Sequence, residues 1–194
     1  MGSTRALRLP LLLVLLALAS CGRGRELRVA MWENGSPRHR GRVHELDCGL
    51  QATTGRWLFW YPDGQLQARG SFRDGPTVLT ADPGGACTLI PRAARTGEWA
   101  AWAPDGSQEW KGSYHDGRRE GTWTWWHPNG RVRLQGGFLA GRENGRHVRY
   151  HPNGRVAVEE VYSAGRRVGR RRVWDAGGNL LEDALLGHEL PGHE

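Results

Sequence analysis

The chain has 194 residues, of which 38% are hydrophobic and 24% are charged, and its formal net charge is +7. This length is enough for one domain. No long apolar run follows the first twenty residues, which excludes a protein that crosses a membrane repeatedly with helices. The positive charge suits anionic partners, but the export signal described next argues against nucleic acid as a ligand.

The first twenty residues are predicted to be a lipoprotein signal peptide, 1–20. Two arginines precede the apolar run 9–19, which is too short for a spanning helix of about 20 residues. The run leads into Leu-Ala-Ser-Cys, which resembles the bacterial lipobox, so Cys21 is expected to carry lipid and to become the mature N-terminus. The alternative is ordinary cleavage after Ala19. Gly22 stands where inner-membrane lipoproteins of enteric bacteria carry aspartate, which favours the outer membrane in a cell that has one.

The number of cysteines supports this interpretation. The chain has three, so acylation of Cys21 leaves Cys48 and Cys87, which are expected to form a disulfide in an exported protein. The bond would join the segment 21–54, predicted as an N-terminal extension or linker, to an insertion at about 76–96. The alternative is two free thiols.

From residue 55 onward the chain repeats with a period of 24 residues. The hexapeptide HPNGRV occurs at 127–132 and again at 151–156. Its proline presets φ, and its glycine takes the left-handed conformation that closes a three-residue hairpin loop. The strand that follows alternates apolar and polar residues, as a half-buried strand does. Glycines begin the five blocks: Gly55, Gly97, Gly121, Gly145 and Gly169. The first two are 42 residues apart because the first block carries 18 extra residues, which are the insertion.

The period therefore predicts an all-β fold of tandem β-hairpin repeats. Five blocks give about nine or ten strands in an elongated, twisted antiparallel meander over 55–181. The C-terminal tail, 182–194, is expected to fray after a short helix at 180–186.

Residues 112–123, GSYHDGRREGTW, resemble a MORN repeat read across the boundary between two blocks. The form Trp-x-x-Trp-x-Pro-Asn-Gly is similar to the bacterial MORN-repeat variant, often labelled YwqK-family antitoxin repeats. The resemblance covers about 55–181 and implies a hairpin array that contacts proteins or lipid surfaces. A classical antitoxin acts in the cytoplasm, which disagrees with the export signal.

No pattern predicts catalysis, a cofactor or a metal site. The chain lacks a nucleophile elbow, a phosphate-binding loop and a metal-type cysteine pair. In the tail, Pro191 lies between His188 and His193, so the two histidines cannot share a helix face as zinc-protease ligands do. His127 and His151 lie two strands apart, about 9.6 Å, which is too far to share one ion, so both are expected to be surface residues beside turns.

The period also aligns two aromatic columns. The first has the parity of the buried residues in a regular hairpin and is predicted to be core: Trp60, Trp102, Trp126, Tyr150 and Trp174. The second faces the other way and is the candidate binding strip, because exposed aromatic patches usually mark binding sites. It comprises Trp57, Phe59, Trp99, Trp123 and Trp125 and continues into His147, Arg149 and Arg171. The alternative is that a bulge, or a covering segment such as 22–54, buries these rings.

The sequence thus predicts a non-catalytic, lipid-anchored envelope protein whose repeats bind or scaffold a partner protein. A carbohydrate or cell-wall binding module is the alternative, because tryptophans stack on sugar rings. The densest run of charge, the arginines of 166–172, is expected to protect a solvated strand edge, or alternatively to contact phosphates of an envelope glycolipid.

Overall fold

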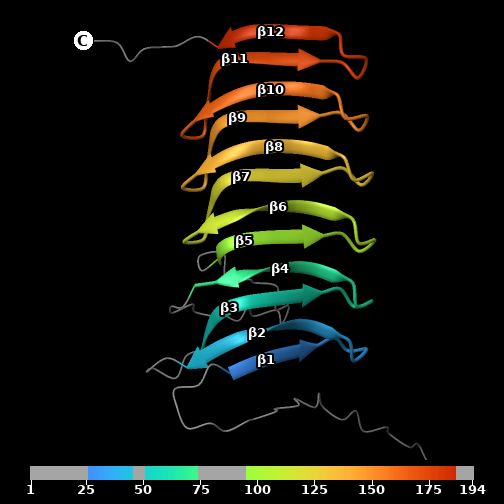
Figure 1. The fold of residues 1–194 in the computed structure, drawn as a ribbon, viewed down its shortest axis with the longest axis vertical. Helices are drawn as coiled ribbons and strands as arrows, with labels where there is room; N and C mark the ends of the chain where they lie inside the picture. The colour runs from blue at the N-terminus through green and yellow to red at the C-terminus, as the bar shows by residue number, and fades with distance from the viewer. Residues whose placement is uncertain (1–25, 46–50, 74–94, 187–194) are drawn as a thin grey trace, which may run out of the picture.

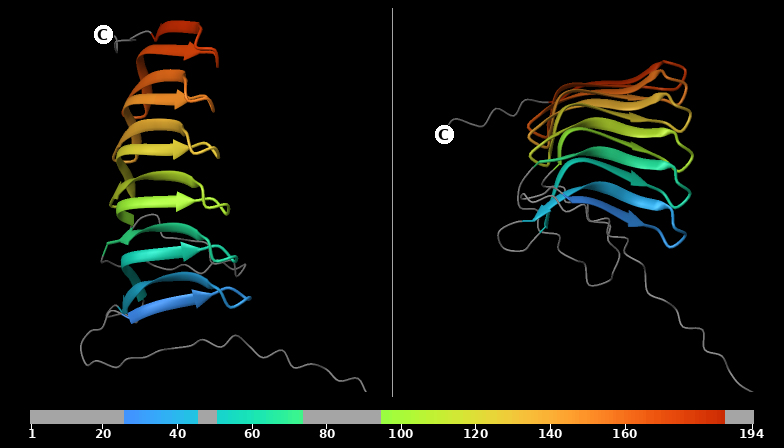
Figure 2. Two further views of the ribbon diagram at one scale, coloured as in Figure 1. Left: turned by 45° about the vertical axis from the view of Figure 1, so that its right-hand side comes forward. Right: turned by 60° about the horizontal axis from the view of Figure 1, so that its bottom comes forward.

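The computed structural model describes residues 26–45, 51–73 and 95–186, which form one open antiparallel sheet of twelve strands. The order of the strands in the sheet equals their order in the chain (Figure 1). The sheet is a ladder of hairpins stacked along one axis (Figure 2). The predicted all-β hairpin array is therefore confirmed. Cys21, Cys48, Cys87 and most of the predicted insertion lie outside the described residues.

The strands are β1 (Glu26–Met31), β2 (Pro37–Glu45), β3 (Gln51–Trp60), β4 (Leu66–Phe72), β5 (Arg95–Trp102), β6 (Gln108–His115), β7 (Arg118–Trp126), β8 (Val132–Leu139), β9 (Arg142–Tyr150), β10 (Val156–Ser163), β11 (Arg166–Trp174) and β12 (Leu180–Leu186).

Two segments were assigned wrongly from the sequence. The expected extension or linker at 21–54 contains β1 and β2, an additional hairpin whose turn has Glu33 where most other turns have proline. The expected helix at 180–186 is the strand β12, which pairs with β11 from Trp174 to Gly169. The edge of β11 offers backbone partners to this leucine-rich segment, and this tertiary pairing overrides its helix propensity.

The three-residue loops form as the repeated tripeptide predicts. Their glycines have φ between 79° and 92°: Gly35, Gly64, Gly106, Gly130, Gly154 and Gly178. In five loops the Asn or Asp before the glycine accepts a hydrogen bond from the backbone N–H two residues further on: Asn34, Asp63, Asp105, Asn129 and Asn153. This side-chain bond fixes the turn locally.

The repeated hexapeptide also joins neighbouring turns. In each copy the histidine, the asparagine and the arginine donate to backbone carbonyls of the next turn. In the first copy these donors are His127 to Tyr150 at 2.9 Å, Asn129 to Pro152 at 2.8 Å, and Arg131 to Asn153. In the second they are His151 to Trp174 at 2.9 Å, Asn153 to Ala176 at 2.7 Å, and Arg155 to Gly177. The two histidines are therefore half-buried links between turns and not merely surface residues.

Replacing Asn153 with aspartate should lower the free energy of unfolding by about 1 kcal/mol, the usual contribution of one hydrogen bond. The substitution keeps the acceptor for the Arg155 N–H but removes the donor to the Ala176 carbonyl. Urea unfolding monitored by circular dichroism measures the change. If Asn153→Ala lowered the stability and Asn153→Asp did not, only the hydrogen bond within the turn would contribute to stability.

A β-bulge beside each three-residue loop decides which face each aromatic column occupies. Trp126 pairs with Val132 but Trp125 pairs with Leu134, so the second strand of this hairpin has one extra residue. The same shift occurs in each described hairpin that has a three-residue loop. Because a one-residue slip exchanges the faces, the apolar residues beyond the bulge, Leu134 and Phe138, lie on the face of Trp123, whereas Val132 shares the face of Trp126.

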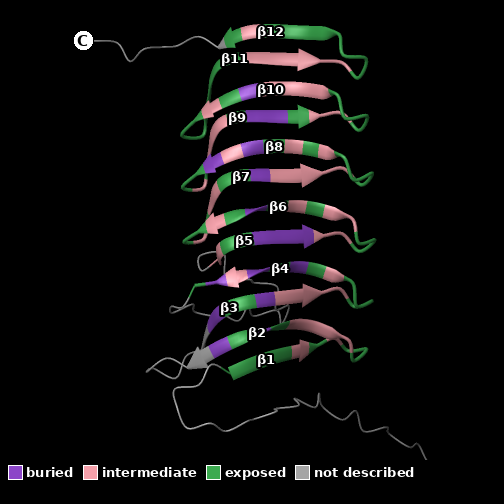
Figure 3. Cartoon of the chain, in the orientation of Figure 1, coloured by how far each residue is buried: buried purple, intermediate pink, exposed green. Residues whose placement is uncertain are grey.

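The expectation that the first aromatic column is the core was therefore wrong. That column is half-buried on one side of the sheet, which we call the opposite face: Trp60, Trp102, Trp126, Tyr150 and Trp174. The other side carries Trp57, Trp99 and Trp123, and we call it the aromatic face. Buried residues recur at similar places along successive strands (Figure 3).

Candidate binding face

An inner row of buried rings lies on the aromatic face. Trp57, Trp99 and Trp123 are 5%, 1% and 2% exposed. Each ring lies over a glycine of the preceding strand. A β-carbon added at Gly70 would lie 2.0 Å from the Trp99 ring, and one at Gly112 would lie 2.2 Å from the Trp123 ring. These tryptophans are the core of the sheet, so the expectation that they form an exposed strip was wrong.

Hydrogen bonds and edge contacts hold the inner row in place. The three indole N–H groups donate to the carbonyls of Thr54, Ser71 and Ser113, respectively. Phe72 meets Trp99 at 5.1 Å and 78°, and Tyr114 meets Trp123 at 4.9 Å and 90°. Edge-to-face geometry of this kind is favourable. The inner row is therefore fixed in position and can support rings that are less buried.

Three half-buried rings, Phe59, Trp110 and Trp125, form an outer row against the inner one. Phe59 contacts Trp57 and Trp99, with centroids 6.0 and 6.3 Å apart. Trp110 stacks on Trp123 at 5.3 Å, and Trp125 lies 5.6 Å from the same ring. Phe59 and Trp125 are thus the rings of the predicted strip that reach the surface.

Trp110 was not predicted to belong to this strip. It pairs with Ala101 and with Trp125, and only the bulge places it on the aromatic face. Once the bulge is known, the 24-residue period identifies Trp110 as the equivalent of Leu134. The signal was in the sequence, but its interpretation required the register.

Two arginines border the ring cluster. The guanidinium carbon of Arg119 lies 4.0 Å from the Phe138 ring centroid, and that of Arg95 lies 4.5 Å from the Trp99 centroid. Cations over aromatic faces at these distances are attracted by the ring quadrupole. The aromatic face therefore offers apolar contact area with positive charge beside it.

Beyond β8 the inner row changes from tryptophan to polar side chains. His147 takes the place of tryptophan in β9. It is 4% exposed, and a β-carbon added at Gly136 would lie 2.2 Å from its ring. Between the next two strands, β10 and β11, Arg171 takes the tryptophan place and Glu160 takes the glycine place, with Arg171 Nε 3.1 Å from Glu160 Oε1. An ion pair thus replaces the glycine–tryptophan pair.

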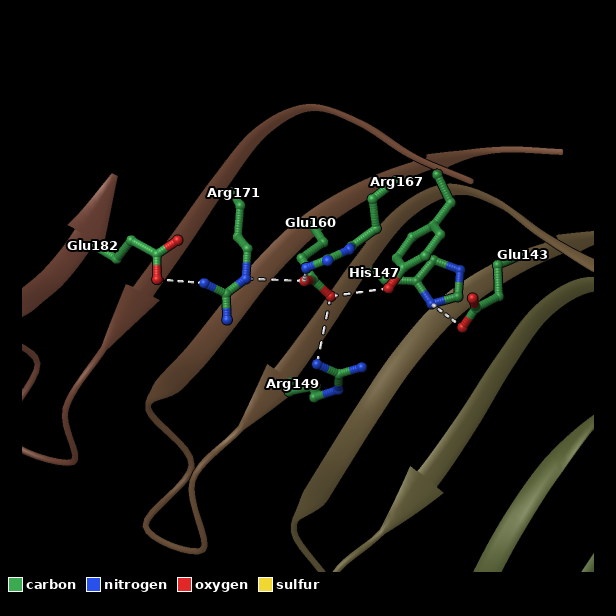
Figure 4. Close-up of polar contacts among 8 residues, drawn as sticks. Glu143, His147, Arg149, Glu160, Arg167, Arg171 and Glu182 are labelled. Atoms are coloured by element: carbon green, nitrogen blue, oxygen red, sulfur yellow. Dashed lines mark hydrogen bonds and ion pairs between the residues drawn. The ribbon is translucent and has the colours of Figure 1, made fainter. Parts of the chain in front are cut away.

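Glu160 is the centre of this ionic cluster and is only 4% exposed. Its carboxylate accepts from Arg167 at 3.1 Å, from Tyr162 at 3.1 Å and from Arg149 at 3.4 Å (Figure 4). Burial alone would raise the pKa of Glu160, but hydrogen bonds from Arg167 and Tyr162 and the charge of Arg149 outweigh it and hold the pKa below its ordinary value. The carboxylate is therefore ionised at neutral pH.

The structure divides the predicted strip into three groups. The buried members are Trp57, Trp99, Trp123 and His147; the half-buried rings are Phe59 and Trp125; and Arg149 and Arg171 belong to the ionic cluster. The arginines of β11 do not form a terminal edge, because β12 covers that strand. Ion pairs to Glu159, Glu160, Glu182 and Asp183 hold most of them.

Within the described ranges no cluster of His, Cys, Asp and Glu side chains is arranged to hold a metal ion. In the same ranges no helix is long and apolar enough to cross a membrane.

Two segments of the chain, 53–74 and 119–138, match the MORN repeat variant family. They cover the hairpins β3–β4 and β7–β8, so these two hairpins are similar to MORN-type repeats, as the resemblance predicted. Comparison with curated proteins gave no match. A solved structure of a Bacteroides fragilis protein of unknown function is 12% identical over 84% of this chain and 94% of that one, with a TM-score of 0.17, a similarity too low to support an argument.

Proposed function

We propose that this chain is a non-catalytic, lipid-anchored envelope protein whose aromatic face binds a partner protein. The observation that supports this proposal is the outer row of Phe59, Trp110 and Trp125, which is half-buried on a fixed inner row of rings. MORN-type repeats are associated with binding to proteins or membranes, and this association agrees with the proposal.

The shape of the face favours a protein over a small molecule. The outer row extends from β3 to β7, about 19 Å at the usual spacing between strands. Tryptophan and arginine, the residues that most often dominate binding energy, lie side by side on it. Because the inner row holds the outer rings in place, binding costs little side-chain entropy. A long, shallow and rigid surface of this kind suits a protein partner.

Replacing Trp125 with alanine should weaken capture of the partner by roughly 30-fold, the effect of losing a hot-spot side chain. Trp126→Ala is the matched control, because Trp126 is equally half-buried but lies on the opposite face. The partner can be captured in cells with a photo-crosslinking residue at position 125 and identified by mass spectrometry. Its affinity for each variant is then measured with the purified proteins.

Three outcomes would contradict the proposal. If Trp125→Ala and Trp126→Ala bound the partner with equal affinity, the aromatic face would not be the docking surface. Crosslinks from position 126 but not from position 125 would place the partner on the other face. A shift of tryptophan fluorescence with purified cell-wall fragments, abolished by Trp125→Ala, would support the carbohydrate-binding alternative instead.

A further inference from the structure

The outermost strand β1 exposes an apolar row. Leu27, Val29 and Met31 are 49%, 48% and 52% exposed, and among the described residues β1 pairs only with β2, so its other edge is open there. Proteins usually protect such edges with charge, proline or a covering segment. A row of exposed apolar side chains on an edge strand therefore indicates that something contacts it.

Exposed arginines accompany these apolar side chains. Arg40 and Arg42 lie directly opposite Val29 and Leu27 in β2, so cationic and apolar side chains alternate on one face. Arg28 projects from the other face of β1. In the described part of the chain none of these three arginines is paired with a carboxylate. The β1 end of the sheet thus combines apolar contact area with available positive charge.

The opposite end of the sheet differs in charge but not in apolar exposure. Leu181 and Leu185 of β12 are 66% and 73% exposed. The same strand carries Glu182 and Asp183, and Asp183 is paired with Arg170 at 3.0 Å. Most arginines of the neighbouring strand β11 are likewise paired with carboxylates. An anionic surface therefore gains less there than at the β1 end, where the three arginines have no carboxylate partner among the described residues.

The chain length before β1 adds a second, independent constraint. Cys21, the proposed lipidation site, is five residues before Glu26. Five extended residues reach at most about 17 Å, so acylation of Cys21 keeps β1 close to the lipid headgroups. The β12 edge lies eleven strand spacings further on, about 53 Å, out of reach of the same bilayer when the sheet stands upright.

We infer that the β1 edge rests on an anionic phospholipid surface, with its apolar row in the headgroup region and Arg28, Arg40 and Arg42 facing phosphates. This inference rests on the lipid anchor of the proposed function. The lipid retains the protein, and the β1 edge orients it, because basic residues beside a lipid chain act as a second membrane signal. The sheet then projects from the membrane, and the aromatic face stays accessible along its length.

The test uses the full acylated protein in vesicles of phosphatidylethanolamine and phosphatidylglycerol. p-Benzoylphenylalanine is introduced at Val29 in one variant and at Leu185 in a matched control. Irradiation should give lipid adducts at position 29 in several-fold excess over position 185. Exchange to neutral phosphatidylcholine should reduce the adducts at position 29, since each arginine near an anionic surface adds roughly fivefold in affinity. Arg28→Gln, Arg40→Gln and Arg42→Gln together should have the same effect.

Equal adduct formation at both positions would overturn the inference, and so would adducts at position 29 that do not depend on lipid charge. Protein–protein adducts between two copies at position 29 would show instead that β1 is a dimer interface. Mass spectrometry of the mature N-terminus shows whether Cys21 carries lipid, and so tests the anchor separately from the membrane contact of β1. If Cys21 is unmodified, the anchor is wrong, and sedimentation of the same chain with anionic vesicles still decides whether the β1 edge binds lipid.

Discussion

Trp123→Ala is expected to lower the free energy of unfolding by about 3–5 kcal/mol, the usual cost of truncating a buried aromatic side chain. The ring is 2% exposed and contacts Trp110, Tyr114, Trp125 and Phe138. The variant would also lose the hydrogen bond that the indole N–H donates to the Ser113 carbonyl. Urea unfolding followed by circular dichroism gives the change. Trp126→Ala, which removes a half-buried ring from the opposite face, should cost clearly less.

Because hairpins in a repeat array contact only their neighbours, the variant should also unfold less cooperatively. Loss of the central ring weakens the junction between the two halves of the ladder, so the slope of the unfolding transition should decrease. An unchanged transition in Trp123→Ala would mean that the inner row does not couple the hairpins.

The glycine under the ring provides the reciprocal variant. In Gly112→Ala the new β-carbon would lie 2.2 Å from the Trp123 ring, so the ring must move. Overpacking of this kind costs about 1–3 kcal/mol. A variant as stable as the wild type would show that the ring can shift freely, contrary to the packing described.

The turns and the repeat could be predicted from local sequence because their determinants are local. Pro128, Asn129 and Gly130 specify a loop without any long-range contact. The first hairpin escaped prediction for the same reason. Asn34 and Gly35 mark its turn as in the later repeats, but Glu33 replaces the proline and Arg28 stands where the next three repeats have tryptophan, so this hairpin was not recognised as a repeat.

The faces of the sheet could not be predicted, because they depend on a single extra residue in the pairing of two strands. Arg133 is that residue in the hairpin of Trp126. An arginine at this position does not by itself indicate a bulge. The bulge nevertheless exchanges the faces of the sheet on which the two aromatic columns lie. Glu160 was also missed as a site residue. Glu160 stands where the earlier repeats have glycine, at a position that does not require the conformational freedom of glycine. Its role becomes clear only when Arg171 is known to lie beside it.

The second large predicted effect concerns the ion pair of Glu160 and Arg171, which takes the place that a glycine–tryptophan pair has in earlier repeats. Glu160→Gly alone should destabilise the protein by about 2 kcal/mol, because Arg171, Arg167 and Tyr162 lose their common acceptor. The arginines can turn partly toward water, which limits the loss. Arg171→Trp alone should be destabilising by a similar amount, because the indole would have to occupy the volume of the Glu160 side chain.

The double variant Glu160→Gly with Arg171→Trp should recover most of the stability, since it recreates the pair formed by Gly112 and Trp123. A double-mutant cycle measured by urea unfolding at pH 7 should give a coupling energy of about 3 kcal/mol. Additive losses would show that the two positions are independent and that the ionic cluster is not a substitute for ring packing.

The pH dependence of the same variants tests the electrostatic part of this argument. The pKa of Glu160 is lowered in the folded protein, so its contribution to stability is fully present above the unfolded pKa and is lost as the pH falls through the folded one. The wild type should therefore lose stability in acid more steeply than the double variant, which has no carboxylate at this position. Parallel pH profiles would mean that the arginines stabilise the cluster without depending on the charge of Glu160, and the ion pair would then not be the reason why this hairpin dispenses with its tryptophan.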